Sequence, residues 1–327
     1  MRSSQGLAVG KIVEGDWIGI FLKQYLRHSC EAFLLMILFG VFRIMPVNVA
    51  SGIGGFLGRS VGPLLSATLR ATRSLGLVYP EKSERERAAI VRDMWDNLGR
   101  SAAEFPHLGK MSRRNGLNVE LVGAEQILEL AANQAPAILV GAHMANWELM
   151  SVFLSRVGLD LTSVARVMNN KLSQVIIEHS RNSYGGARID KNKRGTRQAM
   201  AALRRGGMLG ILFDQKFNNG ITARLMGHEA MTAPGPALLS MQFGCPVIPV
   251  RIERIRGTKF RISCYPAIEA PRTNDKQEDV KLLTQHLNDV LEQWIRERPG
   301  QWLWLHRRWP EAAYGPLEDR HIRDFDS

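Results

Sequence analysis

The sequence is poor in cysteine, and this scarcity restricts the chemistry that it can support. Its 327 residues include only Cys30, Cys245 and Cys264, an odd number without a C-x-x-C pair. A closed disulfide framework and a zinc knuckle are therefore not expected, and a reducing compartment is favoured. The eight histidines are scattered and form no H-E-x-x-H motif, so the sequence predicts neither a metal ion nor a redox cofactor.

The sequence also lacks an uninterrupted apolar run of the ~20 residues needed to cross a bilayer. The run from Ala32 to Phe42 ends at Arg43. It starts late and no convincing cleavage site follows it, so a secretory signal peptide is not expected. Two interpretations remain open: a buried core helix, or a membrane-seated helix with Lys23, Arg27 and Arg43 at its ends.

Acidic residues are outnumbered by basic ones. The chain has 43 Lys and Arg against 31 Asp and Glu, a formal net charge of +12. Such a charge attracts a polyanion, which could be nucleic acid, anionic lipid or an acidic carrier protein. Apolar residues at 45% and charged residues at 23% exclude a disordered, collagen-like or polytopic membrane chain. The length suits one large core, or a core with a helical appendage.

The pattern of apolar residues changes along the chain. Residues 64–108 are polar and periodic, and we expect helices there. From residue 136 strands and helices alternate, which predicts an α/β fold whose central sheet carries helices on both faces. The predicted strands are 137–142, 159–167, 208–213, 246–252 and 259–265, and the predicted helices are 146–157, 172–183, 196–205, 234–243 and 276–297.

Three polar residues follow or end predicted strands: His143, Arg166 and Asp214. Ligands of open α/β sheets bind beyond the carboxyl ends of the strands. We therefore expect these side chains to meet in one cleft.

The segment Gly141-Ala-His-Met-Ala-Asn-Trp-Glu148 suggests a base with its orienting carboxylate. If His143 lies in the loop and Glu148 on the first helical turn, the two can approach. Glu148 would then hold one imidazole nitrogen while the other takes a proton from a hydroxyl group of the substrate. The alternative is that Glu148 only favours the helix N-terminus and that His143 is an ordinary hydrogen-bonded loop residue.

A second motif, Gly58-Arg-Ser60-Val-Gly62, matches the nucleophile elbow G-x-S-x-G in letters. That motif requires a strand before the serine and a helix after it. Here it follows the glycine-rich end of the N-terminal apolar segment, so a catalytic serine is not expected.

The string around His143 resembles the H-x4-D/E motif of the glycerolipid acyltransferases, in its Glu form. Further blocks narrow the resemblance to the late acyltransferases of lipid A biosynthesis, the lauroyl/myristoyl family. These blocks are Arg166-Val-Met-Asn-Asn170 with Arg181 on the next helix, Phe213-Asp-Gln215, Ala230-Met-Thr-Ala-Pro-Gly235, and Pro299 to Trp309 with its His306-Arg-Arg. Departures are Ala165 and Val167 for Tyr and Pro, and Gln215-Lys216 for a more acidic continuation, so the acceptor or the acyl chain is expected to be atypical.

The resemblance implies a mixed central sheet flanked by helices, preceded by a membrane-associated helical segment. We expect residues 1–60 to form that segment and residues 61–327 the acyltransferase domain. The resemblance also implies catalytic roles for His143 and Glu148. It implies substrate binding by Arg166, Asn170, Arg181 and Asp214, although Arg181 could be a surface cation and Asp214 could anchor Arg166 instead.

The implied reaction moves a fatty acyl chain from acyl carrier protein to a hydroxyl of an anionic lipid A precursor, at the cytoplasmic face of the bacterial inner membrane. Another glycolipid, an ornithine lipid or a lysophospholipid could be the acceptor, and a basic membrane- or nucleic-acid-binding protein without catalysis is a further alternative. Nucleic acid is not an expected partner. The aromatic residues Trp302, Trp304 and Trp309, beside Arg307 and Arg308, would suit a membrane interface or a packed core.

Overall fold

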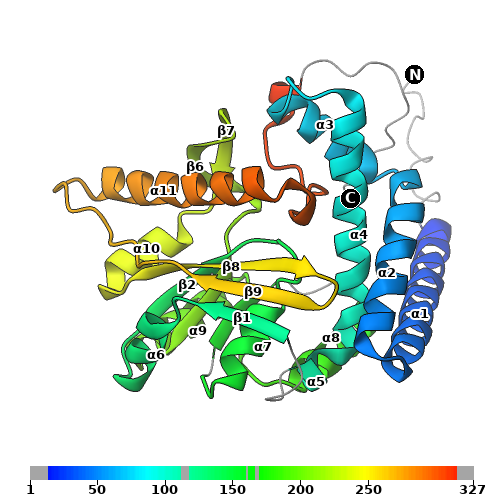
Figure 1. The fold of residues 1–327 in the computed structure, drawn as a ribbon, viewed down its shortest axis with the longest axis horizontal. Coiled ribbons are helices and arrows are strands. Elements are labelled where there is room, and N and C mark those ends of the chain that lie inside the picture. Colours follow the sequence, from blue (N-terminus) through cyan, green and yellow to red (C-terminus); the bar gives the residue numbers. More distant parts are fainter. Residues whose placement is uncertain (1–13, 112–117, 160, 166–168, 315–327) are drawn as a thin grey trace, which may run out of the picture.

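The computed structural model describes residues 14–111, 118–159, 161–165 and 169–314. Its first part is helical (Figure 1). Three helices stand beside the sheet, at the end where β8 points: α1 (Glu14–Ile44), α2 (Val47–Val61) and α4 (Glu84–Glu104). A further helix, α3 (Thr68–Val78), lies at one end of α4. The start of α4 is fixed by a capping box. Ser83 Oγ accepts from the Glu86 amide while the Glu86 carboxylate accepts from the Ser83 amide.

Within the described residues, seven strands form one mixed sheet. In spatial order these are β1 (Asn118–Val122), β9 (Lys259–Cys264), β8 (Val247–Arg256), β2 (Ala137–Gly141), β5 (Met208–Leu212), β3 (Leu161–Ala165) and β4 (Arg188–Asp190). Every neighbouring pair is parallel except β8 and β9. The predicted fold class, a mixed central sheet flanked by helices, is confirmed.

Helices cover both faces of this sheet. Ile138 and Val140 of β2 share a core with α9 (Lys193–Arg204), α10 (Gly235–Phe243) and α11 (Lys276–Glu297). The alternate residues of β2 share the opposite core with α6 (Glu125–Ala132) and α7 (Leu149–Arg156). A strand buried on both faces reads as one apolar run, and this is why β2 is recognisable in the sequence.

Every element predicted from residue 137 onward is present, with ends shifted by a few residues. The sequence analysis missed β1, α6, β4 and a two-stranded hairpin of β6 (Lys216–Leu225) and β7 (His228–Thr232). The four residues of α5 (Leu108–Met111) end the helical part, and α8 (Lys171–Asn182) lies between β3 and β4 in the chain.

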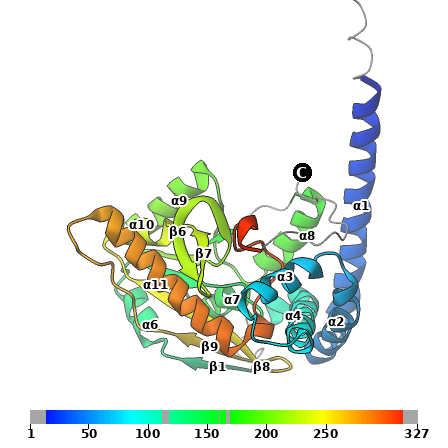
Figure 2. The ribbon, with the colours of Figure 1, turned by 90° about the horizontal axis from the view of Figure 1, so that it is seen from above.

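Helix α1 leaves the body of the protein and extends away from it (Figure 2). Its stretch Gln24–Ile44 is long and apolar enough to cross a membrane, yet only 17% of an apolar 18-residue window within it is buried. Leu34 is 65% exposed and Ile44 84%. The expectation of a buried core helix is therefore wrong, and membrane association stays a prediction.

The C-terminal tryptophans belong to the core. Trp302, Trp304 and Trp309 are each at most 2% exposed; Trp304 stacks on Trp309, and Trp302 packs edge-on against both. Arg308 is fully buried, and its guanidinium donates to Thr232 Oγ1 and Asn288 Oδ1. The expectation that this aromatic and basic segment suits a membrane interface is wrong, because these side chains join β7 and α11 to the interior.

The contact between α2 and α4 depends on glycine. A Cβ atom on Gly58 would collide with the backbone carbonyl of Trp95, and one on Gly99 would collide with the carbonyl of Gly54. Gly58 of the G-x-S-x-G string thus lets two helix backbones approach each other, and Gly62 leaves room for the ring of Trp95. The string runs from the end of α2 into a 3-10 helix (Gly62–Leu64) and does not lie between a strand and a helix. The predicted division of the chain at residue 60, into a membrane-associated segment and an acyltransferase domain, stays a prediction.

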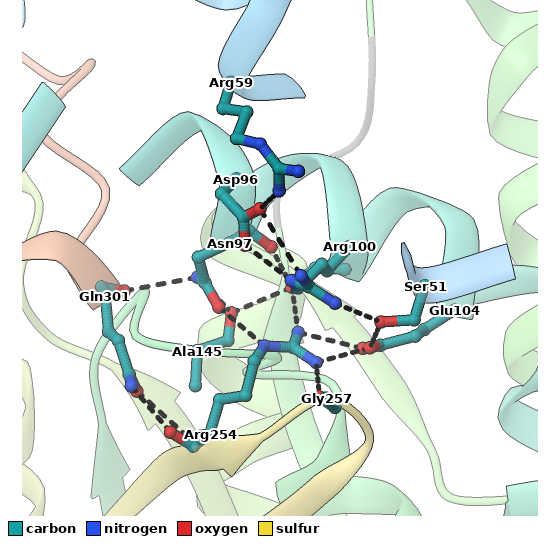
Figure 3. Close-up of polar contacts among 11 residues, drawn as sticks. Ser51, Arg59, Asp96, Asn97, Arg100, Glu104, Ala145, Arg254, Gly257 and Gln301 are labelled. Carbon is teal, nitrogen blue, oxygen red and sulfur yellow. Dashed lines mark hydrogen bonds and ion pairs between the residues drawn. The ribbon is translucent and has the colours of Figure 1, made fainter. Parts of the chain in front are cut away.

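A buried ion pair fastens these helices to the sheet (Figure 3). Arg254 of β8 donates through both terminal nitrogens to the carboxylate of Glu104 on α4, and Ser51 of α2 donates to the same carboxylate at 2.7 Å. Glu104 is fully buried and Arg254 is 7% exposed. Removing one partner would leave a desolvated charge unpaired, so this contact fixes how α2, α4 and β8 sit together.

Two alanine substitutions within α2 test the close helix contact. Gly58→Ala should lower the free energy of unfolding by about 1–3 kcal/mol, because the added methyl group meets rigid backbone. Gly52→Ala, whose Cβ would face open space, should raise it by about 0.5–1 kcal/mol through helix propensity alone. Urea unfolding measures both, and equal effects of the two changes would contradict the packing argument.

Candidate active site

His143 and Asp214 meet at the carboxyl edge of the sheet. His143 comes two residues after β2 and Asp214 two residues after β5, and these strands are parallel neighbours. The imidazole Nδ1 lies 2.8 Å from Asp214 Oδ1, and the backbone N–H of His143 donates to Asp214 Oδ2 at 2.9 Å. The two residues meet as expected, but only His143 lines the cavity at this edge, because Asp214 is buried.

The carboxylate of Asp214 is buried and fully engaged. It is 2% exposed and also accepts a hydrogen bond from the indole of Trp302 at 2.8 Å. Burial by itself would raise its pKa, but the contacts with His143 and Trp302 hold the pKa well below its usual range. An ionised Asp214 accepts a hydrogen bond from Nδ1–H of His143. The proton of the neutral ring is then on Nδ1, and Nε2 is left as the acceptor.

The structure pairs His143 with Asp214 and Glu148 with other residues, so the expected contact between His143 and Glu148 is not seen and the catalytic role of Glu148 stays a prediction. Glu148 precedes α7, and its carboxylate accepts from Arg181 Nη2 at 2.6 Å and from the hydroxyl of Tyr184 at 2.9 Å. Both partners come from the end of α8 or just after it, a long-range contact that local spacing does not reveal. Glu148 does occupy the N-cap position of α7, as the alternative of a favourable helix N-terminus requires, but its side chain makes no capping hydrogen bond and binds Arg181 and Tyr184 instead.

The structure places the three remaining predicted residues differently. Arg181 lines the cavity beside His143, and its pairing with Glu148 outweighs burial and raises its pKa. Asn170 caps α8 and donates to the carbonyl of His28 and to Glu31, which ties α8 to α1. Its substrate-binding role stays a prediction, since its amide is already engaged within the protein. Arg166 lies outside the described residues.

A cavity of about 260 Å³ opens at this edge of the sheet. One part of its wall is polar, with His143, Arg181, Lys191 and Gln215, while Val164 and Leu212 belong to its apolar part. Such a mixed lining suits an amphiphilic substrate. Among the described residues no cluster of His, Cys, Asp or Glu could hold a metal ion.

The loop that carries His143 is held from behind by α4. Ala145 adopts a positive φ of 47°, and its carbonyl accepts from Asn97 Nδ2 and Ser101 Oγ, each at 3.0 Å (Figure 3). A non-glycine residue in this region of backbone space is strained unless its surroundings fix it. Here those donors, and Gln301 O accepting from the Ala145 amide at 3.0 Å, fix it.

Several residues around His143 belong to the site although the sequence did not predict them there. Trp302 supplies the third hydrogen bond to Asp214, and Gln215 lies 3.4 Å from His143 Nε2. His306 stands with its ring centroid 5.4 Å from that of His143. The closing aromatic block and the residue after Asp214 were noticed as parts of the resemblance, but nothing local to them indicates contact with His143.

The chain is similar in sequence to a family of bacterial enzymes. The family model of bacterial lipid A biosynthesis acyltransferases matches residues 21–311. The lipid A biosynthesis palmitoleoyltransferase of Escherichia coli (strain K12) is 24% identical over 274 residues, covering 80% of this chain and 86% of the relative.

Two other enzymes of that organism are similar over most of their length. The lipid A biosynthesis lauroyltransferase is 24% identical and covers 74% of this chain and 79% of its own. The lipid A biosynthesis myristoyltransferase is 23% identical and covers 82% and 83%. The alternative of a basic protein without catalysis is therefore wrong: the chain belongs to the bacterial lipid A biosynthesis acyltransferase family and is an acyltransferase.

Proposed function

We propose that this enzyme transfers a fatty acyl chain from acyl carrier protein to a hydroxyl group on a lipid A precursor, as a late acylation in lipid A biosynthesis. The observation that carries the proposal is the His143–Asp214 pair, whose imidazole opens onto a mixed polar and apolar cavity. The names of the related enzymes support the acceptor class.

His143 acts as the general base of this reaction. Its Nε2 takes the proton of the acceptor hydroxyl while the oxygen attacks the thioester carbonyl, and Asp214 stabilises the imidazolium that forms. The tetrahedral intermediate then expels the carrier thiolate, which recovers the proton from His143. No nucleophile of the protein is required, so Ser60 on α2 takes no part.

Glu148 orders the wall of the cavity in this proposal. Its carboxylate holds Arg181 and Tyr184 in place, and these face the same cavity as His143. The pairing offsets the charge of Arg181, so that the guanidinium offers N–H donors in a fixed direction to an oxygen-rich headgroup. Arg166 stays a proposed contact of the acceptor on the strength of the resemblance alone.

The acyl donor and the membrane supply the acidic partners for a chain of charge +12. Cations near an anionic bilayer contribute about 1 kcal/mol each to binding, and an acidic carrier protein is attracted by the same field. The exposed apolar side chains of α1, such as Phe33 and Leu34, would enter the bilayer, with the catalytic domain on the cytoplasmic side of the inner membrane.

The roles of the two carboxylates can be separated by substitution. His143→Ala and Asp214→Asn should each lower kcat about 10²–10⁴-fold, because one removes the base and the other removes the charge that orients it. Glu148→Gln should act mainly on KM for the acceptor, since it disturbs Arg181 and not the imidazole. The measurement is acyl transfer from acyl carrier protein thioesters to a tetra-acylated lipid A precursor in detergent.

Ser60→Ala is the control and should keep full activity. If Glu148→Gln lost as much kcat as His143→Ala while Asp214→Asn stayed active, Glu148 would be the orienting group after all. If the wild type transferred only to a lysophospholipid or another glycolipid, the reaction class would stand and the acceptor would change.

Membrane association is tested on α1. The double variant Leu34→Lys/Ile37→Lys should float with anionic vesicles several-fold less than the wild type, because each substitution places a charge where an apolar side chain would be buried in lipid. Leu282→Lys, at a similarly exposed apolar position on α11, is the matched control and should float normally. Undiminished flotation of the α1 variant would exclude α1 as the anchor.

A further inference from the structure

The side chain of Gln215 lies where the reaction would take place. It directly follows Asp214 in the chain and lines the same cavity as His143 and Lys191. Its Nε2 is 3.4 Å from Nε2 of His143, the nitrogen that must receive the hydroxyl proton. The amide is therefore the protein group that the reacting oxygen atoms would meet beside the base.

Three contacts fix which end of this amide faces the base. Lys191 Nζ lies 3.3 Å from Gln215 Oε1, and an ammonium group can only donate, so this atom is the carbonyl oxygen. The NH₂ group then points to the two imidazoles, 3.4 Å from His143 Nε2 and 3.2 Å from His306 Nε2. The amide orientation thus follows from the chemistry of its neighbours.

Both imidazoles can accept these hydrogen bonds. His143 donates a hydrogen bond from Nδ1–H to Asp214 and presents a lone pair on Nε2. Burial lowers the pKa of His306 to about 4, so its ring is neutral near neutral pH. Each N–H of the Gln215 amide therefore has an imidazole acceptor in this structure.

Substrate changes the partner of one of these N–H groups. The acceptor hydroxyl must approach His143 Nε2 to about 3 Å before it can lose its proton. In the tetrahedral intermediate the carbonyl oxygen of the thioester lies two bonds from that attacking oxygen. An N–H donor that already stands beside the base is within hydrogen-bond range of this oxygen.

We propose that Gln215 is a catalytic residue that donates a hydrogen bond from Nε2 to the oxyanion of the tetrahedral intermediate, with Lys191 and His306 as positioning residues for its amide. This assignment rests on the proposed acyl transfer. In it the hydroxyl oxygen bonds to the carbonyl carbon, the carbonyl electron pair moves to oxygen, and His143 takes the proton. When the carbonyl re-forms, the thiolate leaves and regains that proton.

The positive charge on Lys191 strengthens this donor. A cation bound to the amide oxygen draws electron density from the nitrogen and makes its N–H groups more acidic. Oriented donors of this kind act on charge that develops only in the transition state, so their loss appears in kcat more than in KM. For a group that merely binds the acceptor, the loss would appear in KM more than in kcat.

The test uses the full-length enzyme in the transfer assay with acyl carrier protein thioesters and a panel of lipid acceptors. Gln215→Ala and Gln215→Glu, which has nearly the same shape but no N–H donor, should each lower kcat about 10²–10³-fold with KM changed by less than about threefold. Gln293→Ala, an exposed amide on α11, is the control and should stay fully active. Circular dichroism melting checks that the Gln215 variants are folded.

The positioning role of Lys191 has its own test. Lys191→Met should lower kcat about tenfold at unchanged KM, and Lys191→Arg should restore most of it because the arginine still donates to Gln215 Oε1. Full activity of folded Gln215→Ala, or a rise in KM alone, would overturn the assignment and leave the acyl transfer standing. A wild type that transfers to no acceptor of the panel would overturn the proposed function and this assignment with it.

Discussion

The active site depends on one buried carboxylate. Asp214 accepts hydrogen bonds from the backbone and the ring of His143 and from the indole of Trp302. These donors come from the loop after β2 and from a segment near the C-terminal end of the described chain. The acceptor, Asp214, follows β5 and lies between them. Because a desolvated charge is stable only while it is fully paired, the carboxylate holds three distant parts of the sequence in one geometry.

A second buried carboxylate supports the same loop from the opposite side. Glu104 of α4 pairs with Arg254 of β8 and also accepts from Asn146 Nδ2 at 2.8 Å, in the loop that carries His143. Arg254 Nε donates in turn to Asn97, which donates to the strained Ala145. The loop therefore lies between two charged clusters, and its unusual backbone is maintained because both clusters would lose hydrogen bonds if it relaxed.

The sequence predicted the sheet better than the site. Strands β2 and β5 are apolar runs bounded by turn signals, and their shared edge correctly placed His143 near Asp214. The hairpin strand β6 gave no such signal, because it is largely polar and mostly exposed or half-buried. Strand β4 has only three residues, too few for a visible alternation.

The choice of the orienting carboxylate shows where local reasoning ends. Glu148 is five residues from His143, whereas Asp214 follows another strand, so spacing alone favours the nearer residue. The structure reverses that choice because Arg181 and Tyr184 hold Glu148, and neither of these contacts is encoded near it in the chain. The apolar N-terminal helix was recognisable by composition, but only the structure shows that most of its described side chains are exposed.

The bridge between Met144 and Trp302 has a consequence for biosynthesis. The ribosome makes the loop of His143 early and residues 301–303 late, and chains begin to fold before their synthesis is complete. A nascent chain without the late segment has neither this bridge nor the indole hydrogen bond to Asp214. The base is therefore assembled only after the late segment has packed against the loop of His143, so that synthesis itself sets the moment at which the enzyme can first act.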